Sequence, residues 1–242
     1  MTLSRCTGTS VDWGLYLVTD PALGGGRDAV TGIVHKSLSG GVSVVQLRDK
    51  ILDDDAFTAR AAELADTLAG TGVPLFVNDR IDIARRLGLH LHIGQDDVDF
   101  RTARSMLPDD LMIGLSVDDR AQILDIEHLM RDGVRPPDVL GLGPVDLTDT
   151  KTDTGRALGV TGPGSVDDLA AHALELGIPS VAIGHVNAGN AAALGRTAVA
   201  GICVVSAVMT ADDPAAAARE LRSLWGGGAA PAPGGRGPRR PP

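Results

Sequence analysis

The feature that most constrains the fold of this chain is an alternation of short apolar runs with Ala-rich, helix-like stretches between residues 15 and 225. The runs are mostly apolar and β-branched at several positions, as buried parallel strands are. The pattern therefore predicts strands at residues 15–19, 42–47, 74–77, 89–93, 111–115, 138–143, 179–184 and 200–205.

The stretches between these runs have the features of helices. Acidic residues gather at the start of 53–70 and 212–225, where they favour the positive end of a helix dipole, and Gly70 stands where a helix would stop. Strands that alternate with helices pair in parallel. Eight such units predict an α/β fold, a closed (β/α)8 TIM barrel, with an open doubly wound sheet as the alternative. A barrel of this kind takes ~250 residues, close to the 242 of this chain.

The repeat also divides the chain into three parts. Residues 1–14 precede the first run and form an N-terminal extension, residues 15–225 form one catalytic barrel domain, and residues 226–242 form a tail. The tail is rich in Gly and Pro and has almost no apolar side chains to bury, so we expect it to be disordered.

The composition of the chain argues against some classes of partner. The net charge of -9 and the 2% of aromatic residues argue against a nucleic-acid partner. The amino terminus has no apolar signal core and no apolar run approaches ~20 residues, so we expect a cytoplasmic protein without a membrane partner. Cys6 and Cys203 are too far apart in the chain to indicate a disulfide framework. A homo-oligomer stays possible.

The first group of polar residues follows the second predicted strand. In a TIM barrel the site lies at the carboxyl ends of the strands, and here the chain reads Gln46-Leu47-Arg48-Asp49-Lys50. Alternation places Gln46, Arg48 and Lys50 on one side, where the two cations would suit a polyanion. The alternative is a solvated loop with ordinary surface charges.

Carboxylates follow the third and fourth strands, in Asn78-Asp79-Arg80 and Gly94-Gln95-Asp96-Asp97. Acidic side chains at the tips of neighbouring strands can share one magnesium ion, which takes one or two protein carboxylates and completes its shell with water and phosphate oxygens. The alternative is that Asp79 and the Asp96–Asp97 pair cap the helices that follow.

Small and hydroxyl-bearing residues end the later strands. Strand 5 ends in Ser116, and the loop after strand 6 carries Thr148, Thr150 and Lys151, a candidate phosphate lid. The loops after strands 7 and 8, with Gly184 and Ser206, occupy the usual barrel phosphate site, where backbone N–H groups face the anion.

Seven of these segments resemble one family, the thiamine-phosphate synthases, also called thiamine-phosphate pyrophosphorylases. They occur in the family's order and are LYLVTD (15–20), QLRDK (46–50), NDR (78–80), HIGQDD (92–97), GLS (114–116), GPVDLTDTK (143–151) and VAIG (181–184). The resemblance implies a transferase that joins two phosphorylated small molecules. It would condense 4-amino-2-methyl-5-(diphosphooxymethyl)pyrimidine with 4-methyl-5-(2-phosphooxyethyl)thiazole, giving thiamine phosphate and pyrophosphate.

The resemblance also implies a role for each matching position. The pyrimidine diphosphate would be held by Gln46, Leu47, Arg48, Asp49, Lys50, Asn78, Ser116 and Lys151. Magnesium would be bound by Asp79 and Asp97, and the thiazole phosphate by Thr148, Asp149, Thr150, Gly184, Val205 and Ser206. The catalytic residues would be Arg48, Lys50, Ser116 and Lys151. Charge stabilisation of the departing diphosphate and correct placement of the thiazole would then drive a dissociative reaction without a protein nucleophile.

The chain departs from the family pattern in two places. His185 stands where the family usually has a second glycine, and a left-handed backbone there would carry a strain cost. The run 87–92 into strand 4 is shortened, so that Asp96 could replace Asp97 as the magnesium ligand.

Three other functions compete with the synthase. A thiazole tautomerase resembles it but lacks the strand 2 cations and the lysine lid. His90-x-His92 could ligate zinc in a metal-dependent hydrolase, although histidines packed near the barrel explain the pair as well, and the remaining helical histidines offer no third ligand. A non-catalytic barrel that binds thiamine precursors is suggested only by His185.

Overall fold

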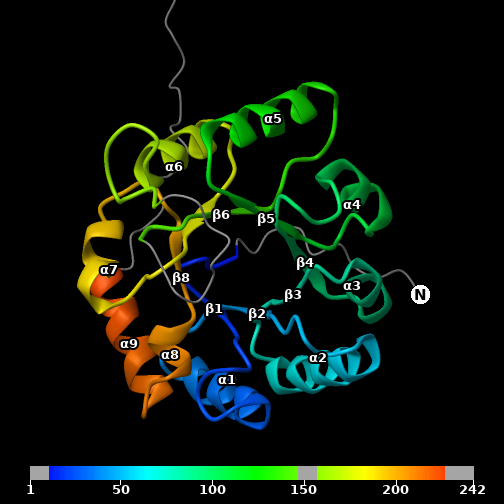
Figure 1. Ribbon diagram of the computed structural model, residues 1–242, viewed down its shortest axis with the longest axis vertical. Helices are drawn as coiled ribbons and strands as arrows, with labels where there is room; N and C mark the ends of the chain where they lie inside the picture. The colour runs from blue at the N-terminus through cyan, green and yellow to red at the C-terminus, as the bar shows by residue number, and fades with distance from the viewer. Residues whose placement is uncertain (1–10, 147–156, 227–242) are drawn as a thin grey trace, which may run out of the picture.

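The computed structural model describes residues 11–146 and 157–226, in which eight parallel strands close into a barrel surrounded by helices (Figure 1). The strands are β1 (Leu15–Val18), β2 (Val44–Leu47), β3 (Leu75–Asn78), β4 (His90–Ile93), β5 (Ile113–Val117), β6 (Val139–Leu142), β7 (Ser180–Ala182) and β8 (Gly201–Val204). The pairing of Leu15 with Ile202 joins β1 to β8 and closes the ring. The predicted TIM barrel is confirmed, and the open doubly wound sheet is wrong.

The helices alternate with the strands and form the outer ring in Figure 1. They are α1 (Val30–Leu38), α2 (Asp54–Leu68), α3 (Ile81–Leu87), α4 (Phe100–Met106), α5 (Arg120–Arg131), α6 (Val166–Glu175), α7 (Ala188–Leu194), α8 (Ser206–Met209) and α9 (Pro214–Trp225). A single 3-10 turn, η1 (Arg27–Ala29), precedes α1. The last helix, α9, packs against α1 and α7 and so completes the ring between the ends of the barrel domain.

Helix starts follow the acidic residues of the sequence. The side chain of Asp53 accepts a hydrogen bond from the N–H of Ala56, 2.8 Å away, at the start of α2, and Asp213 does the same for the first turn of α9. These caps satisfy N–H groups that have no partner within the helix. Beyond α2, Gly70 takes a left-handed backbone with φ 76° that favours glycine.

The strands bury side chains on both faces, which explains their nearly continuous apolar character. Outward side chains such as Leu15, Leu17 and Leu47 pack beneath the helices. Inward side chains, among them Tyr16 and Phe76 with ring centroids 5.7 Å apart, fill the barrel interior. The filled interior leaves space for a ligand only above it, at the ends of the strands.

The boundaries of the barrel domain fall at β1, which begins at Leu15, and at α9, which ends at Trp225. Residues 1–10 and 227–242, which make up most of the predicted extension and tail, lie outside the described residues. In the described part of the chain, no helix combines the length and the apolar character needed to cross a membrane.

Candidate functional site

A cavity of about 270 Å³ opens at the carboxyl ends of the strands. Its volume lies close to the lower end of the range for small-molecule sites, ~300–1,000 Å³. Polar and charged side chains reach it from the ends of every strand except β6, which contributes Gly141, Gly143 and Pro144. They are Thr19, Asp20, Gln46, Arg48, Lys50, Asn78, Asp79, His92, Gln95, Asp96, Asp97, Ser116, Asp118, His185, Cys203 and Ser206. This cavity lies at the end of the barrel where the sequence predicts the site, and its use as the site stays a prediction.

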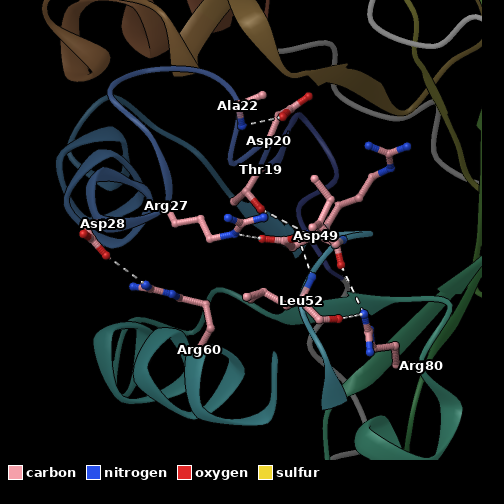
Figure 2. Close-up of polar contacts among 11 residues, drawn as sticks. Thr19, Asp20, Ala22, Arg27, Asp28, Asp49, Leu52, Arg60 and Arg80 are labelled. Carbon is pink, nitrogen blue, oxygen red and sulfur yellow. Dashed lines mark hydrogen bonds and ion pairs between the residues drawn. The ribbon is translucent and has the colours of Figure 1, made fainter. Parts of the chain in front are cut away.

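The strand 2 motif divides by alternation. Gln46, Arg48 and Lys50 line the cavity, and Gln46 is fixed by a hydrogen bond of 3.0 Å from its Nε2 to the hydroxyl of Tyr16. The side chains of Leu47 and Asp49 do not reach the cavity. Leu47 packs under the helices with 2% of its surface exposed, and Asp49 forms an ion pair with Arg27, as Figure 2 shows. The structure therefore places three of the five motif side chains at the cavity, and the other two in the packing around it.

The carboxylates of Asp79 and Asp97 interact with one another at the cavity wall. Burial, together with the hydrogen bond and the negative charge of Asp97, raises the pKa of Asp79 to about 6, while the charges of Lys50 and Arg48 act in the opposite direction. The Nζ of Lys50 lies 3.9 Å from Oδ2 of Asp79. Two carboxylates that face one another in this way suit a site that a cation neutralises.

Neither carboxylate caps a helix, so the capping alternative is wrong. The residue before α3 is Arg80, whose guanidinium pairs with Asp54, and the cap of α4 is Asp99. Asp97 instead accepts a hydrogen bond of 2.7 Å from the N–H of Gly94.

The backbone of Asp79 holds its side chain at the cavity. Its φ is 63°, a left-handed value that is rare outside glycine and that aspartate and asparagine tolerate best. Its N–H donates to the carbonyl of His92 over 2.9 Å, which ties the end of β3 to β4. Only two residues, Gly88 and Leu89, connect α3 to β4, consistent with the shortened run in the sequence.

Ser116 lies at the end of β5 and is held by β4. Its hydroxyl shares a hydrogen bond of 3.0 Å with Nε2 of His92, and its carbonyl accepts one of 2.5 Å from Nε2 of Gln95. A Cβ at Gly114 would come within 2.5 Å of Nδ1 of His92, so the glycine of the GLS segment makes room for the imidazole.

The ends of β7 and β8 form a second part of the rim. Gly184 has φ 94°, and a Cβ there would meet Cα of Pro144 at 2.6 Å, so only glycine fits this position. Val205 and Ser206 lie at the start of α8, where they also line the cavity. These are the three described residues that the resemblance assigns to the thiazole phosphate.

His185 adopts the left-handed backbone that glycine would favour, with φ 57°. Its carbonyl accepts hydrogen bonds from Nδ2 of Asn187 at 3.0 Å and of Asn190 at 2.9 Å. The strain expected from the sequence is therefore present, and two amides hold the residue in place.

The predicted phosphate lid lies outside the described residues, which stop at Asp146 and resume at Ala157. Thr148, Asp149, Thr150 and Lys151 therefore keep the status of sequence predictions.

The two histidines of β4 have different surroundings. His92 lines the cavity, whereas Nδ1 of His90 accepts a hydrogen bond of 3.1 Å from the N–H of Met112, and its ring centroid lies 5.1 Å from that of Phe76. Burial lowers the pKa of His90. Within residues 11–146 and 157–226, no three His, Cys, Asp or Glu side chains form a metal site. The described residues therefore give no support to the zinc hydrolase, and the packed histidine explains His90.

The sequence does not predict which side chains hold Gln46 and Ser116 in place. The hydrogen bonds of Tyr16 with Gln46 and of His92 and Gln95 with Ser116 arise from pairing between strands. Their only signal in the sequence was the alternation that puts Tyr16 inside the barrel and His92 on the side of the strand that faces the cavity.

Comparison with known proteins gives consistent results. Residues 15–208 match the family model described as thiamine monophosphate synthase. The chain is 40% identical over 215 residues to the thiamine-phosphate synthase of Chloroflexus aurantiacus, an alignment that covers 88% of this chain and 93% of that protein.

A longer relative and a solved structure extend the comparison. The chain is 51% identical over 219 residues to the thiamine biosynthesis multifunctional protein ThiED of Corynebacterium efficiens, which covers 90% of this chain but 29% of that protein. The chain thus spans less than a third of that relative. The thiamine phosphate pyrophosphorylase structure from Pyrococcus furiosus is similar with a TM-score of 0.73 and 29% identity, over 89% of this chain and 96% of that one.

Proposed function

The chain belongs to the thiamine monophosphate synthase family, and we propose that it joins the pyrimidine diphosphate to the thiazole phosphate to give thiamine phosphate and pyrophosphate. It is a transferase that moves an alkyl group, the pyrimidine methylene, from a diphosphate oxygen to the thiazole nitrogen.

The observation that carries this proposal is the presence of two separate polar regions in one cavity. Arg48 and Lys50 follow β2, and Gly184 and Ser206 lie at the ends of β7 and β8, with β1 between the two regions. The first region offers cations to a diphosphate, and the second offers a close backbone and a hydroxyl to a phosphate. One cavity can thus hold two phosphorylated substrates with their reactive ends together.

The first region would assist departure of the diphosphate. When the bond between the methylene and the diphosphate oxygen breaks, its electron pair leaves with the diphosphate, so negative charge grows there. Arg48, Lys50 and the predicted Lys151 would stabilise that charge as it develops. Gln46 and Asn78 would hold the same substrate, with Ser116 orienting its ring; His92 and Gln95 hold Ser116 in position.

The charge balance of the cavity suits a magnesium cofactor. Five aspartates but only one lysine and one arginine line the described cavity, so a diphosphate would be repelled without a further cation. Asp79 and Asp97 would hold magnesium, whose bound form would neutralise the diphosphate and complete its shell with phosphate oxygens and water. Burial and the neighbouring Asp97 raise the pKa of Asp79, and a bound cation would stabilise its ionised form.

The second region would place the thiazole. Gly184, Val205 and Ser206, with the predicted Thr148, Asp149 and Thr150, would fix the phosphate so that the ring nitrogen faces the methylene. The nitrogen then supplies the electron pair of the new bond, and no protein nucleophile is needed. Placement of a neutral nucleophile next to a short-lived cation is catalysis by proximity.

The test is incubation of the chain with both substrates and magnesium, followed by detection of thiamine phosphate and pyrophosphate in equal amounts. Omission of magnesium should abolish both products, and Arg48→Gln should reduce both together. A thiazole tautomerase would release no pyrophosphate, and a precursor-binding barrel would bind both substrates without turnover. Either result would contradict the proposal.

A further inference from the structure

Asp49 lies between Arg48 and Lys50 and holds the backbone of the β2–α2 segment that carries these two cations. Asp49 turns away from the cavity, and its carboxylate is almost fully buried, with 3% of the side-chain surface exposed. Oδ1 accepts hydrogen bonds from the N–H groups of Ile51 at 2.9 Å and Leu52 at 3.1 Å. The carboxylate therefore shapes the turn directly after the two cations.

The remaining oxygen of Asp49 is paired with a cation from another loop. Nε of Arg27, which follows β1, lies 2.7 Å from Oδ2 of Asp49, while 40% of the arginine side chain stays exposed. Burial acts to raise the pKa of Asp49, but the hydrogen bond from Arg27 and the two from the backbone hold this pKa below its usual value. Asp49 is thus an ionised, fully partnered group inside the frame of the site.

Two further side chains, Thr19 and Arg80, hold the same segment through three hydrogen bonds. The hydroxyl of Thr19 accepts a hydrogen bond of 3.1 Å from the N–H of Arg48, and the guanidinium of Arg80 donates to the carbonyls of Asp49 and Leu52. Figure 2 shows Arg27 and Arg80 approaching Asp49 and Leu52 from opposite sides. Arg80 in turn lies over the ring of Phe57, 4.5 Å from its centroid.

We propose that Arg27 and Asp49 are positioning residues for the diphosphate, acting through Arg48 and Lys50 without touching the substrate. This inference rests on the proposed function, since it assigns the diphosphate to those two cations. Long basic side chains bind a polyanion tightly only when the backbone that carries them is fixed beforehand. The Arg27–Asp49 pair fixes that backbone from the side away from the cavity.

Loss of Arg27 would act directly on the turn. The Asp49 carboxylate would then be buried without its countercharge, an unfavourable state that favours rotation of the side chain toward water. Rotation would release the N–H groups of Ile51 and Leu52, and the turn after Lys50 would lose its fixed geometry. The thiazole region, on β7 and β8, would be unaffected.

The experiment measures steady-state kinetics and pyrophosphate binding for Arg27→Gln, Arg27→Lys, Asp49→Asn and the double variant Arg27→Gln/Asp49→Asn. Arg27→Gln should raise KM for the pyrimidine diphosphate and the Kd for pyrophosphate by about tenfold, the size of one charge-assisted hydrogen bond. KM for the thiazole phosphate should stay within about twofold. Arg27→Lys should recover most of the affinity because it keeps the charge, and the double variant should lose no more than Asp49→Asn alone because the two residues act as one unit.

Arg222→Gln is the matched control. Arg222 of α9 also forms an ion pair from a partly exposed side chain, with Nη2 2.6 Å from Oδ2 of Asp12. Asp12 precedes β1, so this pair lies at the opposite end of the barrel from the cavity, which neither residue lines. This variant should lower thermal stability with both KM values unchanged.

Other outcomes separate the inference from the proposed function. An Arg27→Gln variant with unchanged pyrophosphate affinity, or with both KM values raised equally, would overturn the positioning role while the wild-type chain still makes thiamine phosphate. Failure of the wild-type chain to make thiamine phosphate would contradict the proposed function instead. If Arg27→Gln does not fold, Asp49→Asn and Arg27→Lys decide the question through the same two KM values.

Discussion

Protons and magnesium should compete for Asp79, and the structure sets the size of the effect. Burial and the neighbouring Asp97 raise the pKa of Asp79 to about 6. Magnesium binds the ionised carboxylate, so the apparent Kd should rise as the group takes up its proton. For one proton, the Kd should be about tenfold weaker at pH 5 than at pH 7, and nearly constant between pH 7 and pH 8.

Isothermal titration calorimetry of magnesium binding at pH 5, 6, 7 and 8 measures this dependence. Repeating the pH 5 titration in a second buffer with a different ionisation enthalpy should show the release of nearly one proton per ion. In Asp79→Asn the binding should be weak and should lose this step near pH 6, since asparagine does not titrate. Asparagine also tolerates the left-handed backbone at this position, so the change does not add backbone strain.

The same titrations identify the second ligand. If Asp97 binds the ion, Asp97→Asn should weaken magnesium binding and Asp96→Asn should not; the reverse result would assign the ion to Asp96. A magnesium affinity that is the same at pH 5 and pH 7 in the wild-type chain would refute the reasoning, because it would mean that Asp79 is not the group that must lose a proton.

Four further predictions follow from particular contacts. Gly114→Ala places a Cβ 2.5 Å from Nδ1 of His92 and should lower kcat about tenfold with the circular dichroism spectrum unchanged; near-normal turnover would argue against a role for the His92–Ser116 bond. His185→Gly should relieve the strain at φ 57° and leave the melting temperature equal or higher, whereas a lower melting temperature would show that the side chain itself stabilises the loop. Arg104→Met breaks an ion pair in which 7% of the arginine side chain is exposed and should cost about 3 kcal/mol in denaturant unfolding; a cost below about 1 kcal/mol would contradict it. Without metal, the folded pKa of Asp79 lies above its unfolded value, so this residue should lower the stability of the fold as pH rises through about 6. The melting temperature of Asp79→Asn should therefore be higher than that of the wild type at pH 8 but not at pH 4.

The fold could be predicted because apolar runs alternate with helix-like stretches eight times along the chain. The expected strand at 89–93 differs from β4 by a single residue, whereas the expected strand at 111–115 begins and ends two residues before β5. The difference at β5 arises from pairing, since Ser116 and Val117 continue the ladder opposite Gly141 and Leu142. When pairing with a neighbouring strand decides where a strand ends, the residues of that strand alone do not predict its end.

The side chains that line the cavity after β2 could be predicted from alternation along the chain, whereas the partners that hold them could not. Arg48 and Lys50 were identified, but the pairing of Asp49 with Arg27 spans 22 residues and depends on how two loops meet above the barrel. Likewise, the raised pKa of Asp79 comes from burial and from Asp97, which belongs to the next strand end. Such interactions are properties of the closed barrel rather than of any segment.

In the 46–50 segment, residues that line the cavity alternate with residues that pack away from it. This alternation explains why a family motif can be contiguous although only some of its side chains face the cavity. On a strand that leads into a turn, neighbouring side chains point to opposite sides, so each residue facing the cavity is followed by one that faces the frame. Leu47 supplies buried apolar surface, and Asp49 supplies the carboxylate that orders the turn. Where Arg27 and Asp49 position the two cations as proposed, both kinds of position in this motif affect diphosphate affinity, and a raised KM for the pyrimidine diphosphate does not by itself distinguish them. A residue that contacts the diphosphate, such as Arg48 or Lys50, would lose affinity when its own charge is removed. A positioning role would instead be shown by recovery of affinity in Arg27→Lys and by a double variant whose loss is not the sum of the two single losses.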